Sequence, residues 1–71
     1  MQEIEHRGYR VMANSYQDDE TGKWIPYADI APIDESPNDP LPMSWEREFD
    51  TQQEADDFAL DGAQFYIDQN F

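Results

Sequence analysis

Few side chains in this sequence of 71 residues could carry catalysis, and they form no recognisable arrangement. The single histidine, His6, lies in a polar stretch with no serine in a strand-turn-helix context, and a chain without cysteine has no thiolate nucleophile. Asp29 lies within the mostly apolar run PYADIAP, and apolar surroundings raise a carboxyl pKa toward the range that general acid catalysis needs. A histidine such as His6 is more often simply exposed to solvent, and a carboxylate such as Asp29 more often lies on the surface of a strand, than either is catalytic. We therefore predict that the protein is not an enzyme.

The spacing of acids and glycines does not indicate a metal or cofactor site. The acidic segment DDETG, residues 18–22, lacks the alternating aspartates and the later glutamate with which a calcium-binding loop surrounds its ion. The glycines at positions 8, 22 and 62 are too scattered for a phosphate-binding loop. We predict no cofactor and no specific metal site. The alternative is a small metal-dependent hydrolase with Asp29 and loop acids at its centre.

The charge of the chain limits its partners. Seventeen acidic residues against four lysines and arginines give a net charge of −13, which repels nucleic acids and anionic membrane surfaces. The N-terminus lacks the basic start and apolar run of a signal peptide, and no apolar stretch approaches the roughly 20 residues of a membrane span. We expect a cytoplasmic protein, bacterial in style, that binds neither nucleic acid nor membrane directly. An acidic mimic of nucleic acid that binds a basic protein is a further alternative.

Alternation of apolar and polar residues predicts three strands in a single small domain of 71 residues. The strands are expected at residues 8–17, 23–33 and 44–49. The acidic segment 18–22 is expected to be the loop of a hairpin. Because Pro26 and Pro32 lack a backbone N–H, the second strand should lie at an edge, be bulged, or pair only at its ends. Residues 34–43, with three prolines and three acids, should form an extended proline-rich acidic surface loop.

The C-terminal part of the chain has the period of an amphipathic helix. Thr51 can cap its start, and Glu54, three residues later, completes a capping box. The predicted buried arc has small residues at its centre and large ones at its sides: Ala55, Ala59, Gly62, Ala63 and Tyr66 in the centre, Phe58 and Phe65 on one side, and Leu60 and Ile67 on the other. This arc is wider than one sheet face needs, so we expect the proline-rich loop or another subunit to cover one side. The predicted fold class is α+β, a three-stranded antiparallel sheet with one C-terminal helix packed on one face.

Two surfaces of this predicted fold are candidates for binding a partner. The helix is expected to cover the sheet face that bears Tyr9, Val11, Trp45 and Phe49. The open face then carries residue types that are enriched in interface cores, namely Arg10, Met12, Tyr16, Ile25 and Tyr27. The outer face of the helix is acidic only, with Glu54, Asp57, Asp61 and Asp68. Ordinary solvated surface is the competing explanation of both features. We predict that the five residues of the open face, together with Asp57, Asp61 and Asp68, contact a partner.

Three segments of the chain resemble a known family. The motifs YRV at 9–11 and GKW at 22–24, followed by FDTQQEADDFALDGA at 49–63, are similar to the β-β-β-α domain of HicB-type antitoxins and of related uncharacterised bacterial proteins. The chain differs in its long proline-rich loop and lacks the glycine that usually precedes the threonine. The resemblance implies protein binding and self-association without catalysis. We therefore predict a non-enzymatic interaction module whose partner is another protein or a second copy of the chain, with the acidic helix favouring basic partners.

Overall fold

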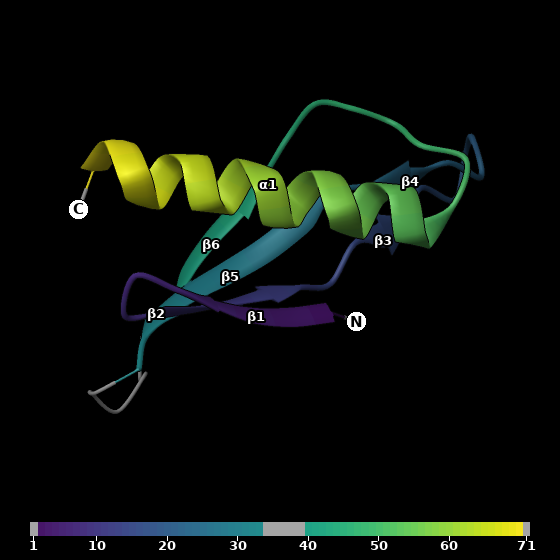
Figure 1. The fold of residues 1–71 in the computed structure, drawn as a ribbon. Helices are drawn as coiled ribbons and strands as arrows, with labels where there is room; N and C mark the ends of the chain where they lie inside the picture. The colour runs from purple at the N-terminus through teal and green to yellow at the C-terminus, as the bar shows by residue number, and fades with distance from the viewer. Residues whose placement is uncertain (1, 34–39, 71) are drawn as a thin grey trace.

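The structure is a computed structural model that describes residues 2–33 and 40–70. Within these residues, six short strands are followed by one long helix (Figure 1). The elements are β1 (Gln2–His6), β2 (Tyr9–Ala13), β3 (Tyr16–Gln17), β4 (Trp24–Ile25), β5 (Tyr27–Pro32), β6 (Leu41–Ser44) and α1 (Gln52–Asn70). The predicted α+β class, with an antiparallel sheet and the C-terminal helix packed on one of its faces, is confirmed.

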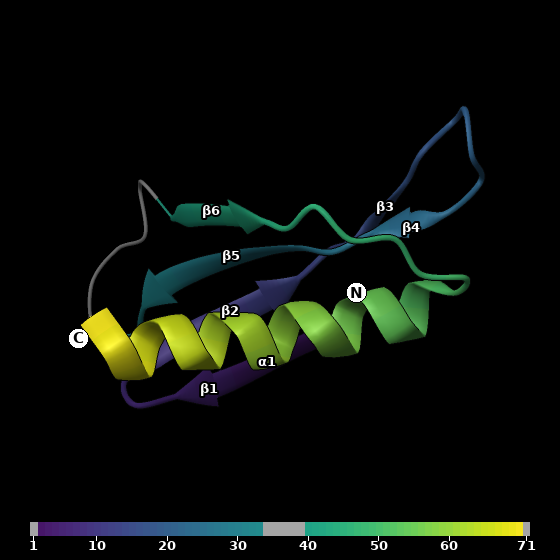
Figure 2. The same cartoon turned by 90° about the horizontal axis from the view of Figure 1, so that it is seen from above.

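The main sheet has four strands in the order β1-β2-β5-β6, and every neighbouring pair is antiparallel. β3 and β4 form a separate two-stranded hairpin, which extends beyond the end of the main sheet near the N-terminal end of α1 (Figure 2). α1 lies mainly over the two middle strands of the main sheet, β2 and β5. The edge strand β6 therefore lies to one side of the helix and the edge strand β1 to the other.

The core lies between α1 and the middle strands. It is formed by Val11, Ala13, Ala28 and Ile30 of the sheet and by Ala59, Leu60, Ala63 and Ile67 of the helix. Ala55, Ala59 and Ala63 are fully buried, which confirms that small residues form the centre of the buried helix face. Because each of these three residues carries only a methyl group, the helix backbone can approach the sheet closely along the centre of this face.

The predicted start of the helix is confirmed. The backbone N–H of Glu54 donates to Oγ1 of Thr51 at 3.2 Å, and the Thr51 hydroxyl lies 3.0 Å from Oε1 of Glu54. Thr51 thus satisfies one of the backbone donors that the first turn of a helix leaves free, and Glu54 places a negative charge at the positive end of the helix dipole. These local contacts explain why the helix begins where the sequence indicates.

β1 corrects the predicted number of strands in the main sheet from three to four. The sequence predicts only a polar approach before residue 8, whereas Gln2–His6 form an edge strand paired along its length with β2. Of its residues on the helix side, Gln2, Ile4 and His6, only one is apolar, so the alternation is hidden. Arg7 and Gly8 have positive φ angles of 51° and 85°, and this left-handed pair makes the two-residue turn that joins β1 to β2.

The first two predicted strands are each interrupted. The segment 8–17 divides into β2 and β3, and the segment 23–33 divides into β4 and β5 at Pro26. Pro26 lies between two strands and Pro32 is the last residue of β5, so neither proline interrupts the interior of a ladder. Of the three alternatives for the second strand, the edge position is wrong, because β5 lies between β2 and β6.

The β3–β4 hairpin confirms the predicted loop at residues 18–22. The N–H of Asp18 donates to the carbonyl of Lys23 at 2.8 Å, and the N–H of Gly22 donates to the carbonyl of Asp18 at 2.8 Å. Gly22 has a φ of 73°, a left-handed conformation that glycine adopts without steric cost.

β6 lies earlier in the chain than the third predicted strand. It runs from Leu41 to Ser44, in a part of the chain that was expected to be loop, and the predicted strand at 44–49 is wrong. Residues 34–39 of the predicted loop lie outside the described residues. Pro42 is tolerated in β6 because an edge strand needs hydrogen-bond donors on one side only.

The segment that follows β6 wraps around the side of α1 instead of continuing the sheet. Trp45, Arg47 and Phe49 alternate as strand residues do, yet what they share is contact with one helix side chain, Phe58. Phe49 makes an isolated bridge with Trp24, in which each backbone N–H donates to the other's carbonyl at 2.8 and 2.9 Å. The alternation in sequence therefore reflects a shared helix contact and not a strand.

Candidate binding surfaces

His6 and Asp29, the two candidates for catalysis, lie in different parts of the fold. Asp29 alternates with the buried residues of β5 and so lies on the sheet face that turns away from α1, with Tyr27 Oη 3.5 Å from its Oδ1. Partial desolvation, followed by the charge of Asp29, raises the pKa of the Tyr27 hydroxyl. His6 Nε2 instead lies 2.9 Å from Asp68 Oδ1 on the helix. Within residues 2–33 and 40–70 there is no pocket and no group of three or more potential metal ligands.

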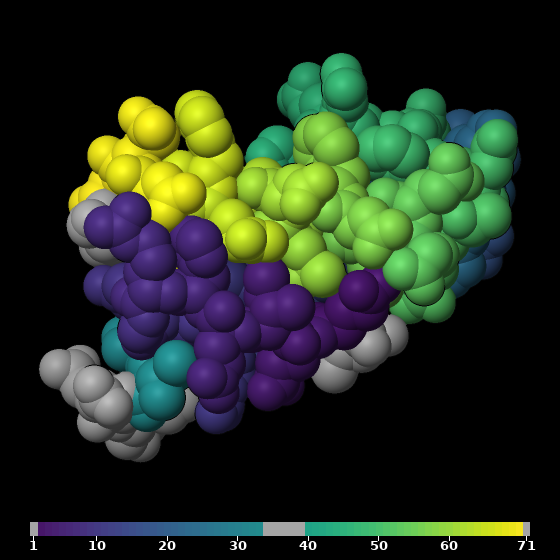
Figure 3. Space-filling model, in the orientation of Figure 1, coloured from purple at the N-terminus to yellow at the C-terminus, as the bar shows by residue number. Residues whose placement is uncertain are grey.

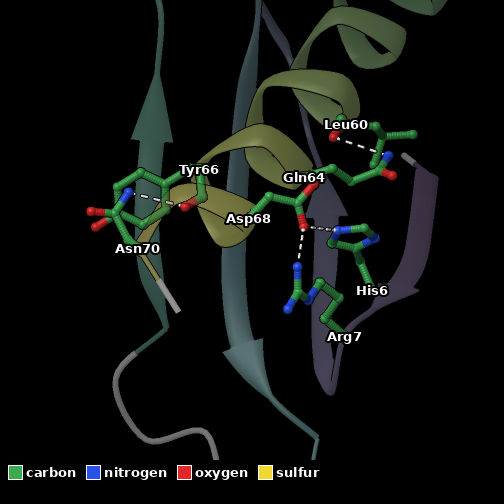
Figure 4. A network of polar contacts seen from close by, with 7 residues as sticks. All are labelled: His6, Arg7, Leu60, Gln64, Tyr66, Asp68 and Asn70. Carbon is green, nitrogen blue, oxygen red and sulfur yellow. Dashed lines mark hydrogen bonds and ion pairs between the residues drawn. The ribbon is translucent and has the colours of Figure 1, made fainter.

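Polar side-chain contacts join α1 to β1 and to the turn that follows β1 (Figure 4). Asp68 Oδ1 is 2.9 Å from His6 Nε2 and accepts a hydrogen bond from Arg7 Nη1 at 3.2 Å. Near the start of β1, Gln2 Nε2 donates to Asp57 Oδ1 at 3.3 Å. The hydrogen bond with His6 lowers the pKa of Asp68, and Arg7 lowers it further, while partial desolvation opposes them. Two of the helix carboxylates that were predicted to contact a partner thus tie the helix to the β1–β2 hairpin.

An aromatic cluster covers the first half of the opposite side of α1. The ring of Trp45 meets that of Phe58 edge-on, with centroids 5.7 Å apart and planes at 88°, and the Phe49 centroid lies 5.4 Å from that of Phe58. The Arg47 guanidinium carbon lies 5.3 Å from the centre of the Phe58 ring, within the range of a cation–π interaction. Trp45 also lies against Gly62, one turn further along the helix. The segment after β6 therefore supplies the cover that the sequence analysis expected from the proline-rich loop or another subunit.

Beyond Gly62 the same side of the helix is open. Phe65 is 67% exposed, and Leu41, which lies on the helix-facing side of β6, is 39% exposed. We define the β6-side patch as these two residues together with three partly buried residues that pack against the core: Leu41, Met43, Trp45, Phe65 and Tyr66. Figure 3 shows a hollow here, between the yellow end of the helix and the teal and green atoms of β6 and the segment that follows it. The prediction that Phe65 is buried is wrong, because the covering segment reaches only as far as Gly62.

The five residues predicted for the open sheet face lie together. Arg10, Met12 and Tyr27 alternate with core residues of β2 and β5, so they lie on the face away from α1. The Tyr16 ring meets the Tyr27 ring edge-on at 6.4 Å, and Ile25 pairs with Tyr16 across the β3–β4 hairpin. This surface and the helix carboxylates lie on different faces of the sheet, so the predicted set of residues divides into two separate surfaces.

All four lysines and arginines of the chain are engaged by the chain's own side chains. The contacts are Arg7 with Asp68, Arg10 with Glu3 at 3.2 Å, Lys23 with Asp50, and Arg47 with the ring of Phe58. Within residues 2–33 and 40–70 these ion pairs involve three carboxylates, those of Glu3, Asp50 and Asp68, so most of the acids in these ranges have no lysine or arginine partner there. Asp61, exposed on the outer face of α1, is one of these. The surface is therefore anionic with no basic side chain free to balance it.

Asp56 is a structural residue that the sequence analysis missed. It is 2% exposed, and its Oδ1 accepts a hydrogen bond at 3.0 Å from the backbone N–H of Ser15, at the bend between β2 and β3. A signal was present, because on a helical wheel Asp56 falls within the buried arc, between Ala63 and Ile67. The predicted buried arc contained no acidic residue, so Asp56 was left out of it.

Comparison with known proteins gives a family but no activity. Residues 1–71 match a family model described as a domain of unknown function (DUF6566). The search of curated proteins found no match, and neither comparison gives a HicB-type antitoxin. No helix in the described ranges 2–33 and 40–70 has the length and apolar character that crossing a membrane requires. Any argument about function therefore depends on the surfaces described above.

Proposed function

The chain belongs to this family of domains of unknown function, and on that premise we propose that it is a non-enzymatic acidic module that binds a basic protein partner in the cytoplasm. The β6-side patch is the proposed contact surface. The observation that carries the proposal is the position of Phe65, a large apolar side chain that is 67% exposed on the surface of a chain with far more carboxylates than lysines and arginines.

The chemistry of the patch supports a partner that is both basic and partly apolar. Aromatic side chains that a folded domain leaves exposed concentrate at binding surfaces, where their burial against a partner supplies much of the affinity. Glu46, which is exposed, follows Trp45 in the chain. Asp61, also exposed, lies one turn before Phe65 on the helix. Carboxylates around an apolar centre speed encounter with a cationic protein and disfavour nucleic acids and anionic membranes.

The open sheet face is the second candidate surface. Its most exposed ring is Tyr16, which is 50% exposed against 67% for Phe65, whereas Met12 and Tyr27 are partly buried and Arg10 is paired with Glu3. A homodimer through either surface would bring together two chains that each carry a net charge of −13, and their repulsion opposes it. Light scattering over a dilution series at ordinary salt is expected to show a monomer. A stable dimer would favour the self-association that the HicB resemblance implies.

The roles of the ionisable side chains support an absence of catalysis. His6 is held by Asp68, and Asp29 lies on a flat sheet face. The alternative of a metal-dependent hydrolase requires a divalent ion near Asp29. A titration with manganese or calcium, followed by amide spectra, is expected to give no site-specific shift, and a saturable shift around Asp29 would favour the hydrolase.

A mimic of nucleic acid is a narrower form of the same binding chemistry. Such a module would occupy the groove in which a basic protein normally holds DNA or RNA, so nucleic acid would compete with it for the partner. Loss of the complex on addition of DNA or RNA would support the mimic, and a complex that survives this competition would leave the β6-side patch as an ordinary protein contact.

Site-specific photocrosslinking in cells tests the proposed function directly. A benzophenone amino acid replaces Phe65 in one variant and Gln53, an exposed residue elsewhere on the same helix, in the matched control. The variant at Phe65 is expected to form a discrete adduct with a basic protein, and the variant at Gln53 is not. Absence of an adduct from Phe65, or identical adducts from both positions, would contradict the proposal.

A further inference from the structure

The two edges of the main sheet differ in their surroundings. Among the described residues β1 pairs only with β2 and β6 only with β5, so each edge strand has one row of backbone groups without a strand partner. Beside β1, the side chains of Gln2 and His6 are bonded to carboxylates of the helix. Beside β6, Leu41 and Phe65 are exposed. Apart from Pro42, which has no N–H, the β6 edge therefore combines backbone groups without a strand partner with exposed apolar side chains, as strand addition requires.

The space beside α1 suits a strand better than a second helix. α1 lies mainly over β2 and β5, the two middle strands of the sheet. Since strands are about 4.8 Å apart and a helix is about 10 Å wide, the strip of sheet left uncovered above β6 is only a few ångströms wide. An added strand would instead lie in the plane of the sheet, about 4.8 Å beyond β6. Its alternate side chains would face the helix side, as Leu41 and Met43 do.

Resting on the proposed function, we propose that the basic partner binds by adding an extended segment to the outer edge of β6 as a fifth strand. Apolar side chains on one face of this segment contact Leu41 and Phe65. Lysines or arginines on its other face extend across Pro42 toward Asp29, which pairs with Pro42 in the sheet register and lies on the open face. The partner is thus recognised by an alternation of apolar and basic residues.

A second copy of the chain does not match this description. β6 offers leucine, proline, methionine and serine but no basic residue, and both copies would carry a net charge of −13. Pro42 also lacks the N–H that an edge-to-edge pair of two β6 strands could use, and prolines in short edge strands are a common protection against self-association. A basic segment from another protein has neither the charge conflict nor the second proline.

The test uses the whole isotope-labelled chain and a short synthetic peptide in which lysine alternates with valine or phenylalanine. Two further versions carry N-methyl groups on every second amide, in the two possible phases. Successive N–H groups of a strand point to opposite sides, so only one phase removes the donors that face β6. A shuffled peptide of the same composition with helical spacing completes the set.

Strand addition predicts that the alternating peptide shifts and protects the amides of Leu41–Ser44. One methylated phase is expected to weaken binding at least about tenfold while the other is not. Phe65→Ala is expected to weaken binding by about tenfold, because it removes the aromatic ring that the peptide covers, and Asp29→Asn by several-fold.

Any of three results would overturn strand addition: amide shifts at Gln2–His6 in place of Leu41–Ser44, equal binding by the two methylated peptides, or equal binding by the shuffled peptide. A basic partner could then still bind in another manner. Failure of every peptide to bind would also overturn strand addition. The proposed function would then be decided separately by the crosslinking at Phe65.

Discussion

Trp45 packs directly against the backbone of Gly62, since a Cβ at position 62 would lie 2.6 Å from Cζ2 of the indole. That distance is shorter than ordinary van der Waals contact, so only glycine fits without a shift of the ring. The contact fixes the segment after β6 to the middle of α1. It also sets the point at which the covered half of that side of the helix ends and the β6-side patch begins.

Gly62→Ala is expected to destabilise the domain. Alanine is favoured over glycine inside a helix by about 1 kcal/mol, but overpacking against a ring typically costs about 1–3 kcal/mol, so we expect a net loss of about 1 kcal/mol. Urea unfolding monitored by circular dichroism measures it. In a Trp45→Leu background, which removes the clash, the same change should be neutral or stabilising. An increase in stability from Gly62→Ala in the otherwise unchanged chain would contradict the close packing.

Asp56→Ala is expected to cost about 1–3 kcal/mol of unfolding free energy, because it leaves the buried N–H of Ser15 without its acceptor. Asp56→Asn keeps an oxygen at the same position and should cost less. Asp61→Ala is the control of equal charge change, since Asp61 is exposed and should alter stability by less than about 0.5 kcal/mol. Equal effects of the alanine changes at positions 56 and 61 would show that the buried hydrogen bond does not hold the connection between β2 and β3.

The pH dependence of stability should reveal the contacts of Asp68. Its pKa is lowered in the folded protein, first by the hydrogen bond with His6 and then by Arg7. A carboxyl whose folded pKa lies below its unfolded value stabilises the fold above the unfolded value, and this contribution is lost as the pH falls through the folded pKa. We therefore expect Asp68→Asn to be less stable than Asp61→Asn, which removes the same charge from a residue without such contacts.

This difference between the Asp68→Asn and Asp61→Asn variants should be present above the ordinary carboxyl pKa of 3.8 and disappear as the solution becomes more acidic than that value. Urea midpoints of the two variants over a pH series measure it. A difference that persists or grows in acid would mean that the contacts with His6 and Arg7 do not favour the charged form of Asp68.

Two phenylalanines on one side of α1 should differ sharply in their contribution to stability. Phe58→Ala removes a ring that touches Trp45, Phe49 and Arg47 and is expected to cost about 3 kcal/mol. Phe65→Ala removes an exposed ring and should change the unfolding free energy by less than about 0.5 kcal/mol. Urea unfolding of both variants provides the comparison. A large loss from Phe65→Ala would mean that the ring is buried within the domain and is not free for a partner.

The helix and the hairpin loop could be predicted because their signals are local. Thr51 and Glu54 lie three residues apart, and the loop at 18–22 is closed by its own backbone. β1 could not be found in this way. Its polar residues have meaning only through partners far along the chain, since Gln2 and Asp57 are 55 residues apart and His6 and Asp68 are 62 apart. Alternation along β1 is too weak a signal, because two of its three residues on the helix side are polar.

The open sheet face was predictable residue by residue, because alternation along β2 and β5 survives the interruptions at their ends. The β6-side patch was not. Phe58 and Phe65 occupy equivalent positions in the helical pattern, and which of them stays exposed depends on where the segment after β6 meets the helix. That is a question of tertiary packing, set by Trp45 and Gly62. The helical period of a sequence identifies the apolar side of a helix but not which other segment of the chain packs against that side.

Hydrogen–deuterium exchange of the chain, alone and with the protein captured through position 65, tests most directly whether the β6-side patch is the partner surface. Binding there predicts slower exchange at Leu41–Ser44 and in the C-terminal half of α1, with the β3–β4 hairpin unchanged. Slower exchange across Tyr9–Ala13 and the β3–β4 hairpin, with β6 unaffected, would contradict it and place the partner on the open face of the sheet.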